Sequence, residues 1–245
     1  MWDNNRLEEG YILGVVRQIR RRQPRLGVRK IHYLLPRFGI SAGRDRIFEL
    51  LQRNGLLVDR RRNYRRTTDS YHRFHKHPNL IKDLEVQRPN QVFVSDITYL
   101  ETQEGFCYLA LITDLYSRKI VGWDLSQSLS IDGCQRALRQ ALRGVADSAG
   151  LIHHSDRGIQ YCSNGYVDIL RNKNIKISMT EENHCYENAV AERINGILKD
   201  EFQLGQMLTS YQAADRLTRE AVHIYNDERP HCSLNYQTPA QRYAA

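Results

Sequence analysis

The chain has 245 residues, enough for one domain of roughly 150 residues and a smaller module beside it. Its composition, with 41% hydrophobic and 26% charged residues and a mean hydropathy of −0.60, is typical of a soluble globular protein and argues against a membrane protein. No secretory segment follows Met1, and the five cysteines form no CxxC pair, so we expect a cytoplasmic location and neither a disulfide framework nor a zinc ribbon.

The positive charge is concentrated in the first third of the sequence. Residues 1–78 hold 19 Lys and Arg against 7 Asp and Glu, a net charge of +12, and the remaining residues carry −4 of the total of +8. This asymmetry is expected of an arm that binds a polyanion and is joined to a domain with a different task. A basic surface that only keeps the protein soluble is the alternative.

Residues 1–58 are predicted to form a small helical module. Apolar residues at helical spacing predict a first helix that ends before Pro24, a second over Val28–Leu35, and a third with Ser41 as its N-cap. The expected core stripes are Leu7, Tyr11, Val15 and Ile19 in the first helix and Ile47, Leu50 and Leu51 in the third. A helix-turn-helix-like fold fits this pattern, with Arg44 and Arg46 as candidate DNA contacts, and a generic helical bundle fits it equally well.

Residues 59–88 are predicted to be a basic linker. The stretch Arg60–Tyr71 has no apolar period and carries five arginines, of which Arg61 and Arg65 are candidate DNA contacts. An arginine-rich connector can lie along phosphates and gain affinity that does not depend on base sequence, whereas a merely solvated linker is the alternative.

Residues 89–245 are predicted to form an α/β domain. Three β-rich runs, Val92–Leu100, Phe106–Asp114 and Lys119–Asp124, predict an antiparallel meander. The patterns after Ser130 predict a helix, a strand, a helix, a strand and two long helices. Their expected ranges after the first helix are Leu151–Ser155, Tyr166–Arg171, Ile175–Met179, Asn188–Phe202 and Ser210–Tyr225, the last with a capping box at Thr209 and Gln212. These elements describe a mixed five-stranded sheet flanked by helices.

Two aspartates occupy positions in this sheet that local structure does not explain. Asp96 lies in the middle of a predicted strand, where β-propensity disfavours it. Asp156 ends the fourth strand, before a bend that we attribute to the freedom of Gly158. Asp114 also ends a strand, but it precedes a turn and is interpreted as a turn or capping group.

Glu192 lies on the polar side of a predicted helix, with 35 residues between it and Asp156. At 100° per residue, Asn188, Asn195 and Lys199 fall within about 60° of Glu192, and the apolar residues lie on the opposite half. A surface helix normally has this pattern, so the stripe alone is weak evidence of function. Three carboxylates without a His or Cys partner do suit Mg²⁺ or Mn²⁺, and two such ions can promote an in-line phosphoryl displacement.

Five segments of the sequence carry a family resemblance. They are VSDITYL around Asp96, TDLYSRKIVGW at 113–123, HSDRGIQYCS at 154–163, CYENAVAERINGILKDE at 185–201 and YNDERPHCSLNYQTPA at 225–240. The chain resembles the OrfB-type (second reading frame) DDE transposases of bacterial insertion sequences, relatives of retroviral integrases with an RNase H-like catalytic core. It departs from their usual pattern at Glu187 and at Arg193-Ile194-Asn195.

The resemblance implies an RNase H-like core in which Asp96, Asp156 and Glu192 are the catalytic residues and hold two Mg²⁺ or Mn²⁺ ions. The implied reaction is DNA 3′-end cleavage followed by strand transfer, with Lys199 in contact with the transposon end. Asn195 and Arg229 are further candidate DNA contacts. Expected partners are the double-stranded DNA of the transposon ends and target, other copies of the chain and a first-frame OrfA-type segment, which implies a nucleoid-associated protein.

Two rival functions stay open at this point. One is a nuclease that cleaves RNA–DNA hybrids on the same fold, and the other is a non-catalytic, transposase-derived DNA-binding regulator. The 35-residue spacing and the basic arm disfavour the first, and the intact carboxylates disfavour the second.

Overall fold

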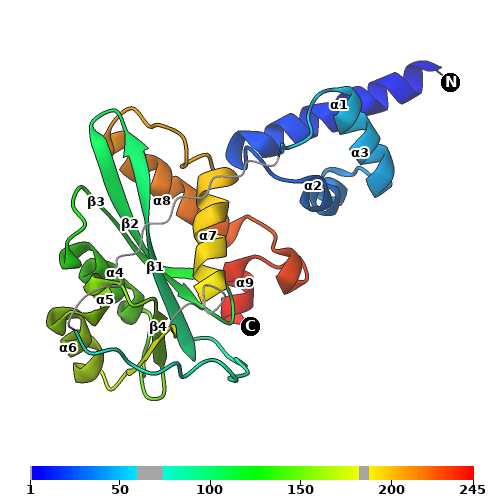
Figure 1. Ribbon diagram of the computed structural model, residues 1–245. Coiled ribbons are helices and arrows are strands. Elements are labelled where there is room, and N and C mark those ends of the chain that lie inside the picture. Colours follow the sequence, from blue (N-terminus) through cyan, green and yellow to red (C-terminus); the bar gives the residue numbers. More distant parts are fainter. Residues whose placement is uncertain (1, 60–73, 182–187) are drawn as a thin grey trace.

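The computed structural model of the chain describes residues 2–59, 74–181 and 188–245 (Figure 1). None of the helices in these ranges combines the length and apolar character needed to cross a bilayer.

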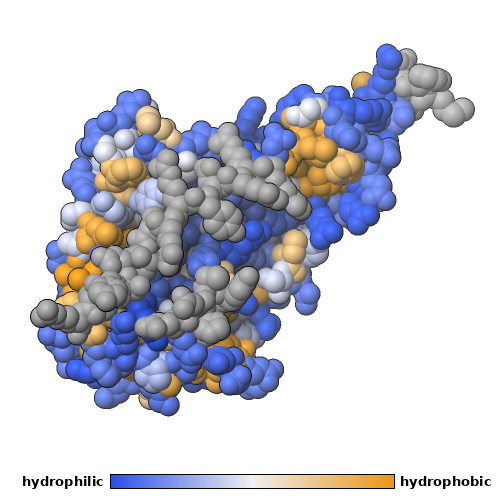
Figure 2. Space-filling model, viewed as in Figure 1, coloured by the Kyte–Doolittle hydropathy of each residue, from blue (hydrophilic) through white to orange (hydrophobic). Residues whose placement is uncertain are grey.

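The N-terminal part consists of three helices and a short 3-10 turn. These elements are α1 (Trp2–Arg22), α2 (Val28–Leu34), η1 (Leu35–Phe38) and α3 (Arg44–Arg53). The predicted stripe of α1 is partly wrong, because Leu7 and Tyr11 are 71% and 57% exposed. Steps of four residues drift around a helix by about 40° each, so the buried face is instead formed by Ile12, Val15, Val16 and Ile19. Figure 2 shows hydrophobic residues gathered at the surface of this part of the molecule.

The third helix agrees with the prediction in its core and differs at its start. Ile47, Leu50 and Leu51 are buried as expected. Ser41 is not its N-cap, because α3 begins after Gly43, and Gly43 has no side chain with which to cap it. Gly55 follows the helix in the left-handed conformation, with φ of 64°, which glycine adopts at little cost.

The central sheet has five strands in the order β3-β2-β1-β4-β5. The strands are β1 (Val92–Thr102), β2 (Gly105–Asp114), β3 (Ile120–Ser126), β4 (Ile152–Ser155) and β5 (Lys176–Met179). The first three form an antiparallel meander, and β4 and β5 join parallel to β1. The mixed five-stranded sheet flanked by helices is therefore confirmed.

Helices cover both faces of the sheet (Figure 1). They are α4 (Ile131–Arg143), α5 (Ile159–Cys162), α6 (Asn164–Asn172), α7 (Ala189–Asp200), α8 (Tyr211–Asp227) and α9 (Pro239–Ala244), with a 3-10 turn η3 (Cys232–Leu234) before α9. Residues of β2 alternate between the two faces: Ala110 and Ile112 pack with α4–α6, and Leu109 and Leu111 pack with α7 and α8. The second strand is thus buried on both sides.

The sequence prediction missed α5 and α9 and misplaced one capping box. Ser210 caps α8 by accepting a hydrogen bond from the backbone of Ala213, so the predicted box at Thr209 and Gln212 is wrong. A capping box does occur at the start of α9, where Thr238 and Gln241 exchange hydrogen bonds.

The N-terminal part is attached to the end of α7 and to the C-terminal segment. Lys30 Nζ lies 3.1 Å from Glu201 Oε1, and the same oxygen lies 2.8 Å from Arg229 Nη2. The rings of Tyr33 and Tyr236 stack at 4.6 Å. Polar and aromatic contacts therefore fix the basic module beside the helix that carries Glu192.

Part of the predicted linker packs on the domain that contains the five-stranded sheet. The Pro78 carbonyl oxygen accepts a hydrogen bond from Met179 N at 3.3 Å, and Ile81 and Val86 pack beside the buried residues Val92 and Ile152. The segment just before β1 is thus held against the edge of the sheet.

Candidate active site

The strand register places Asp96 and Asp156 beside each other. In the parallel pair of β1 and β4, Ser95 lies opposite Ser155, so the two aspartates are the next residues along their strands. The side chains of Asp96 and Asp156 therefore lie in the same region, at the carboxyl end of β4. Only the tertiary pairing brings these residues together, since 59 residues separate them in the sequence.

The carboxyl group of Asp96 lies in a field that opposes its ionisation. Burial and then the negative charge of Asp156 raise the pKa of Asp96 to about 8, and Glu192 adds to the rise. Hydrogen bonds from Asn195 and from the backbone of Ile97 oppose the rise without cancelling it. The three acidic residues therefore interact electrostatically.

Asp156 is held by the turn that follows β4. Its Oδ1 atom accepts a hydrogen bond from Gly158 N at 3.0 Å. A Cβ atom on residue 158 would lie 2.9 Å from that same oxygen, closer than real Cβ contacts. Gly158 has φ of −63°, which any residue adopts, so the reason for glycine is this close approach and not the conformational freedom that we expected.

Glu192 lies in the first turn of α7 and is exposed, as its helical stripe predicts. Burial and the charge of Asp156 both raise its pKa. Within residues 2–59, 74–181 and 188–245, however, no three His, Cys, Asp or Glu side chains lie close enough together to hold a metal ion. The carboxylates share one electrostatic field without forming a closed ligand cage.

Asn195 faces Asp96 instead of solvent. Its side chain is 6% exposed, and Nδ2 donates a hydrogen bond of 2.7 Å to Asp96 Oδ2. The prediction that Asn195 contacts DNA therefore does not agree with the structure. The helical stripe gave a wrong prediction because α7 lies over β1, and the sheet covers one edge of the polar face of the helix. Asn188, on the same stripe, is also buried, and its side chain donates a hydrogen bond to Ser95 O.

Lys199 lies close to the acidic residues. Its Nζ atom is 4.3 Å from the centroid of the Tyr99 ring. Burial lowers the pKa of Lys199, and the charge of Asp96 partly restores it. Contact of Lys199 with DNA stays a prediction, now with a defined place beside Asp96.

The other candidate DNA contacts differ in accessibility. Arg44 and Arg46 lie on α3, where they pair with Asp45 and Glu8. Arg229 is only 2% exposed and pairs with Glu201, so the prediction that it contacts a phosphate is wrong. Its guanidinium group instead belongs to the contacts that attach the N-terminal part to the end of α7. Arg61 and Arg65 lie outside the described residues.

A buried polar cluster joins β1 and β4, the strands of the acidic residues, and the sequence prediction missed it. Ser95 Oγ and Tyr166 OH lie 2.8 and 2.9 Å from His153 Nε2, and burial lowers the pKa of His153 to about 3. The neutral ring can therefore accept a hydrogen bond at Nε2 from one of these hydroxyl groups, and the Ser95 and Tyr166 side chains also hydrogen-bond to each other. Two adjacent histidines in a short, fully buried strand were the available signal.

Asp114 has the structural role that we predicted. Its carboxylate is fully buried and accepts hydrogen bonds from Asn90 N, Ser117 N and Ser117 Oγ. It therefore closes the turn between β2 and β3 and takes no part in the acidic site.

The chain is similar to integrases and transposases over most of its length. Residues 86–185 and 173–239 match families described as "Integrase core domain". The chain is 38% identical over 216 residues to a 31 kDa protein of insertion element IS600 from Shigella sonnei, a match that covers 87% of this chain and 79% of that protein. It is 33% identical over 221 residues to the transposase of IS904 from Lactococcus lactis, covering 88% of this chain and 86% of the relative.

Solved structures agree on the fold. The catalytic core of HTLV-2 integrase, in complex with magnesium, aligns with a TM-score of 0.51 at 17% identity, over 64% of this chain and 97% of that one. The integrase of a simian T-cell lymphotropic virus intasome aligns with a TM-score of 0.52 at 17% identity, over 90% of this chain and 71% of that one. Together with the sheet order, these likenesses confirm the RNase H-like fold. The chain belongs to the insertion-sequence transposases that carry an integrase core domain.

Proposed function

We propose that this chain is the catalytic subunit of its transposase and that Asp96, Asp156 and Glu192 carry out metal-dependent DNA 3′-end cleavage and strand transfer. The observation that supports this most directly is the pairing of β1 with β4, which sets Asp96 beside Asp156, where burial and the Asp156 charge raise the pKa of Asp96. A group of carboxylates that raise one another's pKa values is a suitable donor set for a hard divalent cation.

Mg²⁺ or Mn²⁺, two ions in this proposal, would neutralise the carboxylates and supply Lewis-acid stabilisation of the attacking and leaving oxygens. The magnesium complex of the HTLV-2 integrase core supports the choice of metal. Asp96, Asp156 and Glu192 would be the ligands, and since they form no closed cage, the proposal includes a movement of at least one of them on metal binding.

The other residues of the site position the groups that react. Asn195 orients the Asp96 carboxylate through its Nδ2 atom. Lys199, beside Asp96, provides a positive charge for a DNA phosphate. The basic N-terminal module and linker supply affinity for the DNA backbone that does not depend on base sequence.

We further propose that the working form is an assembly on DNA. The likeness to an integrase within an intasome supports self-association on transposon ends and target DNA. A first-frame OrfA-type segment is a further partner in this proposal.

The test uses the purified chain with a duplex that carries the element's end, taken from matching inverted sequences beside the gene. We expect cleavage and strand transfer that require Mg²⁺ or Mn²⁺, and near-complete loss of both in Asp96→Asn and Glu192→Gln. Asp168→Asn on α6 and Glu220→Gln on α8 are matched controls, because these exposed residues lie outside the acidic site.

Strand transfer that persists in Asp96→Asn or Glu192→Gln would remove these residues from catalysis. Metal-independent DNA binding without transfer, even after addition of a first-frame segment, would favour the regulator. Preferential cleavage of an RNA–DNA hybrid would favour the nuclease.

A further inference from the structure

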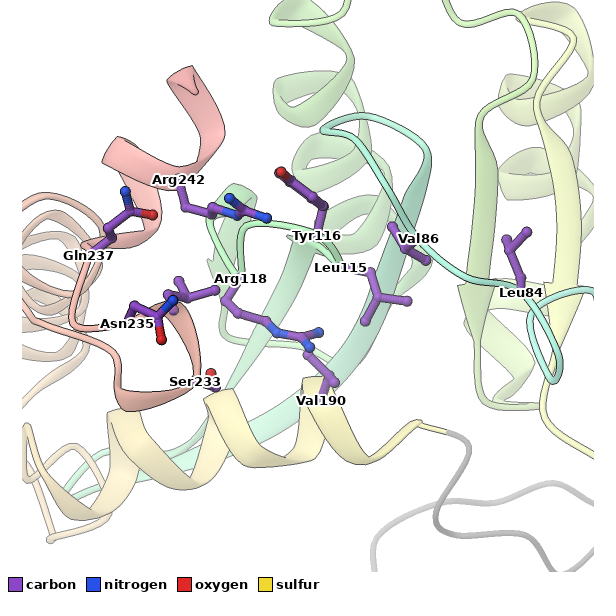
Figure 3. A pocket seen from close by; sticks show the side chains of 11 residues that line it. Leu84, Val86, Leu115, Tyr116, Arg118, Val190, Ser233, Asn235, Gln237 and Arg242 are labelled. Carbon is purple, nitrogen blue, oxygen red and sulfur yellow. The ribbon is translucent and has the colours of Figure 1, made fainter.

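A pocket of about 450 Å³ lies outside the acidic site (Figure 3). One side is formed by the turn between β2 and β3, with Leu115, Tyr116 and Arg118. Val190 at the start of α7 and the residues before α9 close it from two other directions. The pocket is half-open, so a ligand can enter it from solvent.

Three of the five segments that carry the family resemblance meet at this pocket. Segment 113–123 supplies the turn, segment 185–201 supplies Val190, and segment 225–240 supplies Ser233, Asn235 and Gln237. Segments 113–123 and 225–240 contain none of the three acidic residues, so the acidic site does not explain why they carry the resemblance. Both segments contribute side chains to this pocket.

The charged side chains that line the pocket are both cationic, and the Asp114 carboxylate nearby offsets part of the Arg118 charge. Arg118 and Arg242 both line it, and no acidic residue is among its described lining residues. No ion pair of the described part of the chain includes either arginine, and Arg118 Nη1 is buried there without a hydrogen-bond partner. The nearby Asp114 carboxylate is already engaged by backbone and hydroxyl donors. Two guanidinium groups that line one pocket without an ion-pair partner favour the binding of an anion there.

The geometry of the pocket suits a phosphate that carries an apolar group. The Arg242 guanidinium lies 4.2 Å from the centroid of the Tyr116 ring, in a cation–π contact. Figure 3 shows polar side chains on one side of the two arginines and the apolar side chains of Leu84, Val86 and Leu115 on the other. An inorganic anion would use only the polar side, whereas a sugar phosphate uses both.

We propose that this pocket binds the DNA backbone away from the acidic site, with a phosphodiester between Arg118 and Arg242 and its deoxyribose against the apolar wall. The proposal rests on the function proposed above. The contact does not read base sequence, so it fixes the position of the DNA on the enzyme.

The test measures binding of a short fluorescein-labelled DNA duplex by anisotropy across a salt series. Loss of one phosphate contact lowers the slope of log K against log salt by about 0.9 and weakens binding roughly five- to tenfold at moderate salt. We expect this result for Arg242→Gln, and weaker binding for Gln237→Glu, which adds a like charge for the phosphate to meet. Arg118→Gln in addition to Arg242→Gln should lower the slope further.

The matched controls are Gln127→Glu, at a different cavity, and Arg143→Gln, at the exposed end of α4, and both should bind DNA as the wild type does. Thermal unfolding verifies that each variant is folded; Gln237 is exposed and Arg242 half-buried near the chain end, so neither change removes a core residue.

Wild-type affinity and salt slope in folded Arg242→Gln and Gln237→Glu would overturn the proposal. So would saturable binding of dAMP or inorganic phosphate that Arg242→Gln abolishes while DNA binding is unchanged, because the ligand would then be a free anion. If the pocket variants bind DNA normally and the wild type still performs strand transfer, only the pocket proposal fails. If the wild type neither binds nor cleaves DNA, the proposed function fails as well.

Discussion

Asn195 is the residue that most directly tunes the acidic site. It is the side chain that donates a hydrogen bond to Asp96 Oδ2, and its own Oδ1 atom is buried without a partner in the described part of the chain. An unpaired buried oxygen is costly, so its position beside the carboxylates indicates a role that a simple surface residue would not have. Asn195 is therefore a positioning residue for Asp96.

We predict that Asn195→Ala slows strand transfer by roughly 10- to 100-fold, as is typical when a group that orients a metal ligand is lost. DNA affinity should stay at the wild-type level, because Asn195 is buried. Single-turnover rates and anisotropy measure the two quantities separately. Asn164→Ala on the exposed start of α6 is the control, and equal rates in both variants would show that Asn195 has no such role.

At the scale of elements, α7 is held at both ends. Asn188 donates to Ser95 O just before its start, and Glu201 follows its end with ion pairs to Lys30 and Arg229. These cations lower the pKa of Glu201 although burial raises it. Removing one partner of a buried ion pair leaves an uncompensated charge, which is far more costly than the pair itself is stabilising.

Glu201→Gln should therefore lower the free energy of unfolding by about 3–5 kcal/mol at neutral pH, because the Lys30 and Arg229 cations lose their shared partner. Urea unfolding measures this, with exposed Glu220→Gln expected within about 0.5 kcal/mol of the wild type. Since the folded pKa of Glu201 is lowered, its contribution is present above the ordinary pKa of 4.5 and is lost as pH falls through the folded value.

The difference between Glu201→Gln and the wild type should accordingly shrink in acid below pH 4.5. An equal difference at pH 7 and in strong acid would show that the carboxylate's charge is not what stabilises the contact. The neutral combination Lys30→Met, Glu201→Leu and Arg229→Met should recover most of the lost stability, because no buried charge is left unpaired.

The buried His153 and the half-buried His231 contribute to the response of the complete fold to acid. Burial is the main cause that lowers the pKa of both His153 and His231 to about 3. The unfolded chain takes up protons on these side chains below the ordinary pKa of 6.5, but the folded chain does not. These two histidines therefore lower the stability of the fold as pH falls from 6.5 towards 3. The Asp96 carboxyl, whose pKa the fold raises to about 8, acts in the opposite direction between pH 8 and its ordinary pKa of 3.8.

We expect each histidine to contribute a loss of roughly 1 kcal/mol by pH 5.5. Urea midpoints between pH 7.5 and 5 measure the slope. His231→Phe keeps an aromatic ring against Tyr225 and should lose roughly 1 kcal/mol less stability than the wild type between pH 7.5 and 5.5, because the Asp96 contribution is common to both proteins. The same pH dependence in His231→Phe and in the wild type would show that the fold does not hold His231 neutral.

Much of the fold follows from patterns that are local in the sequence. Runs rich in β-forming or apolar residues predicted the five strands, helical spacing predicted the long helices, and a carboxylate in the middle of a strand singled out Asp96. Periodicity reports which residues share a face, because side-chain direction depends only on the local backbone. The sequence also shows that the excess positive charge lies in residues 1–78.

Contacts between distant segments were decided by the tertiary structure alone. Periodicity does not say what covers a face, so Asn195 and Arg229, polar by type, were mistaken for DNA contacts although the fold buries both. The cationic pocket depends on side chains from the β2–β3 turn, α7 and the C-terminal segment. Local patterns predicted most of the helices and strands and the acidic residues on them. Which residues meet depends on how these elements pack, and packing rests on long-range contacts that no local pattern records.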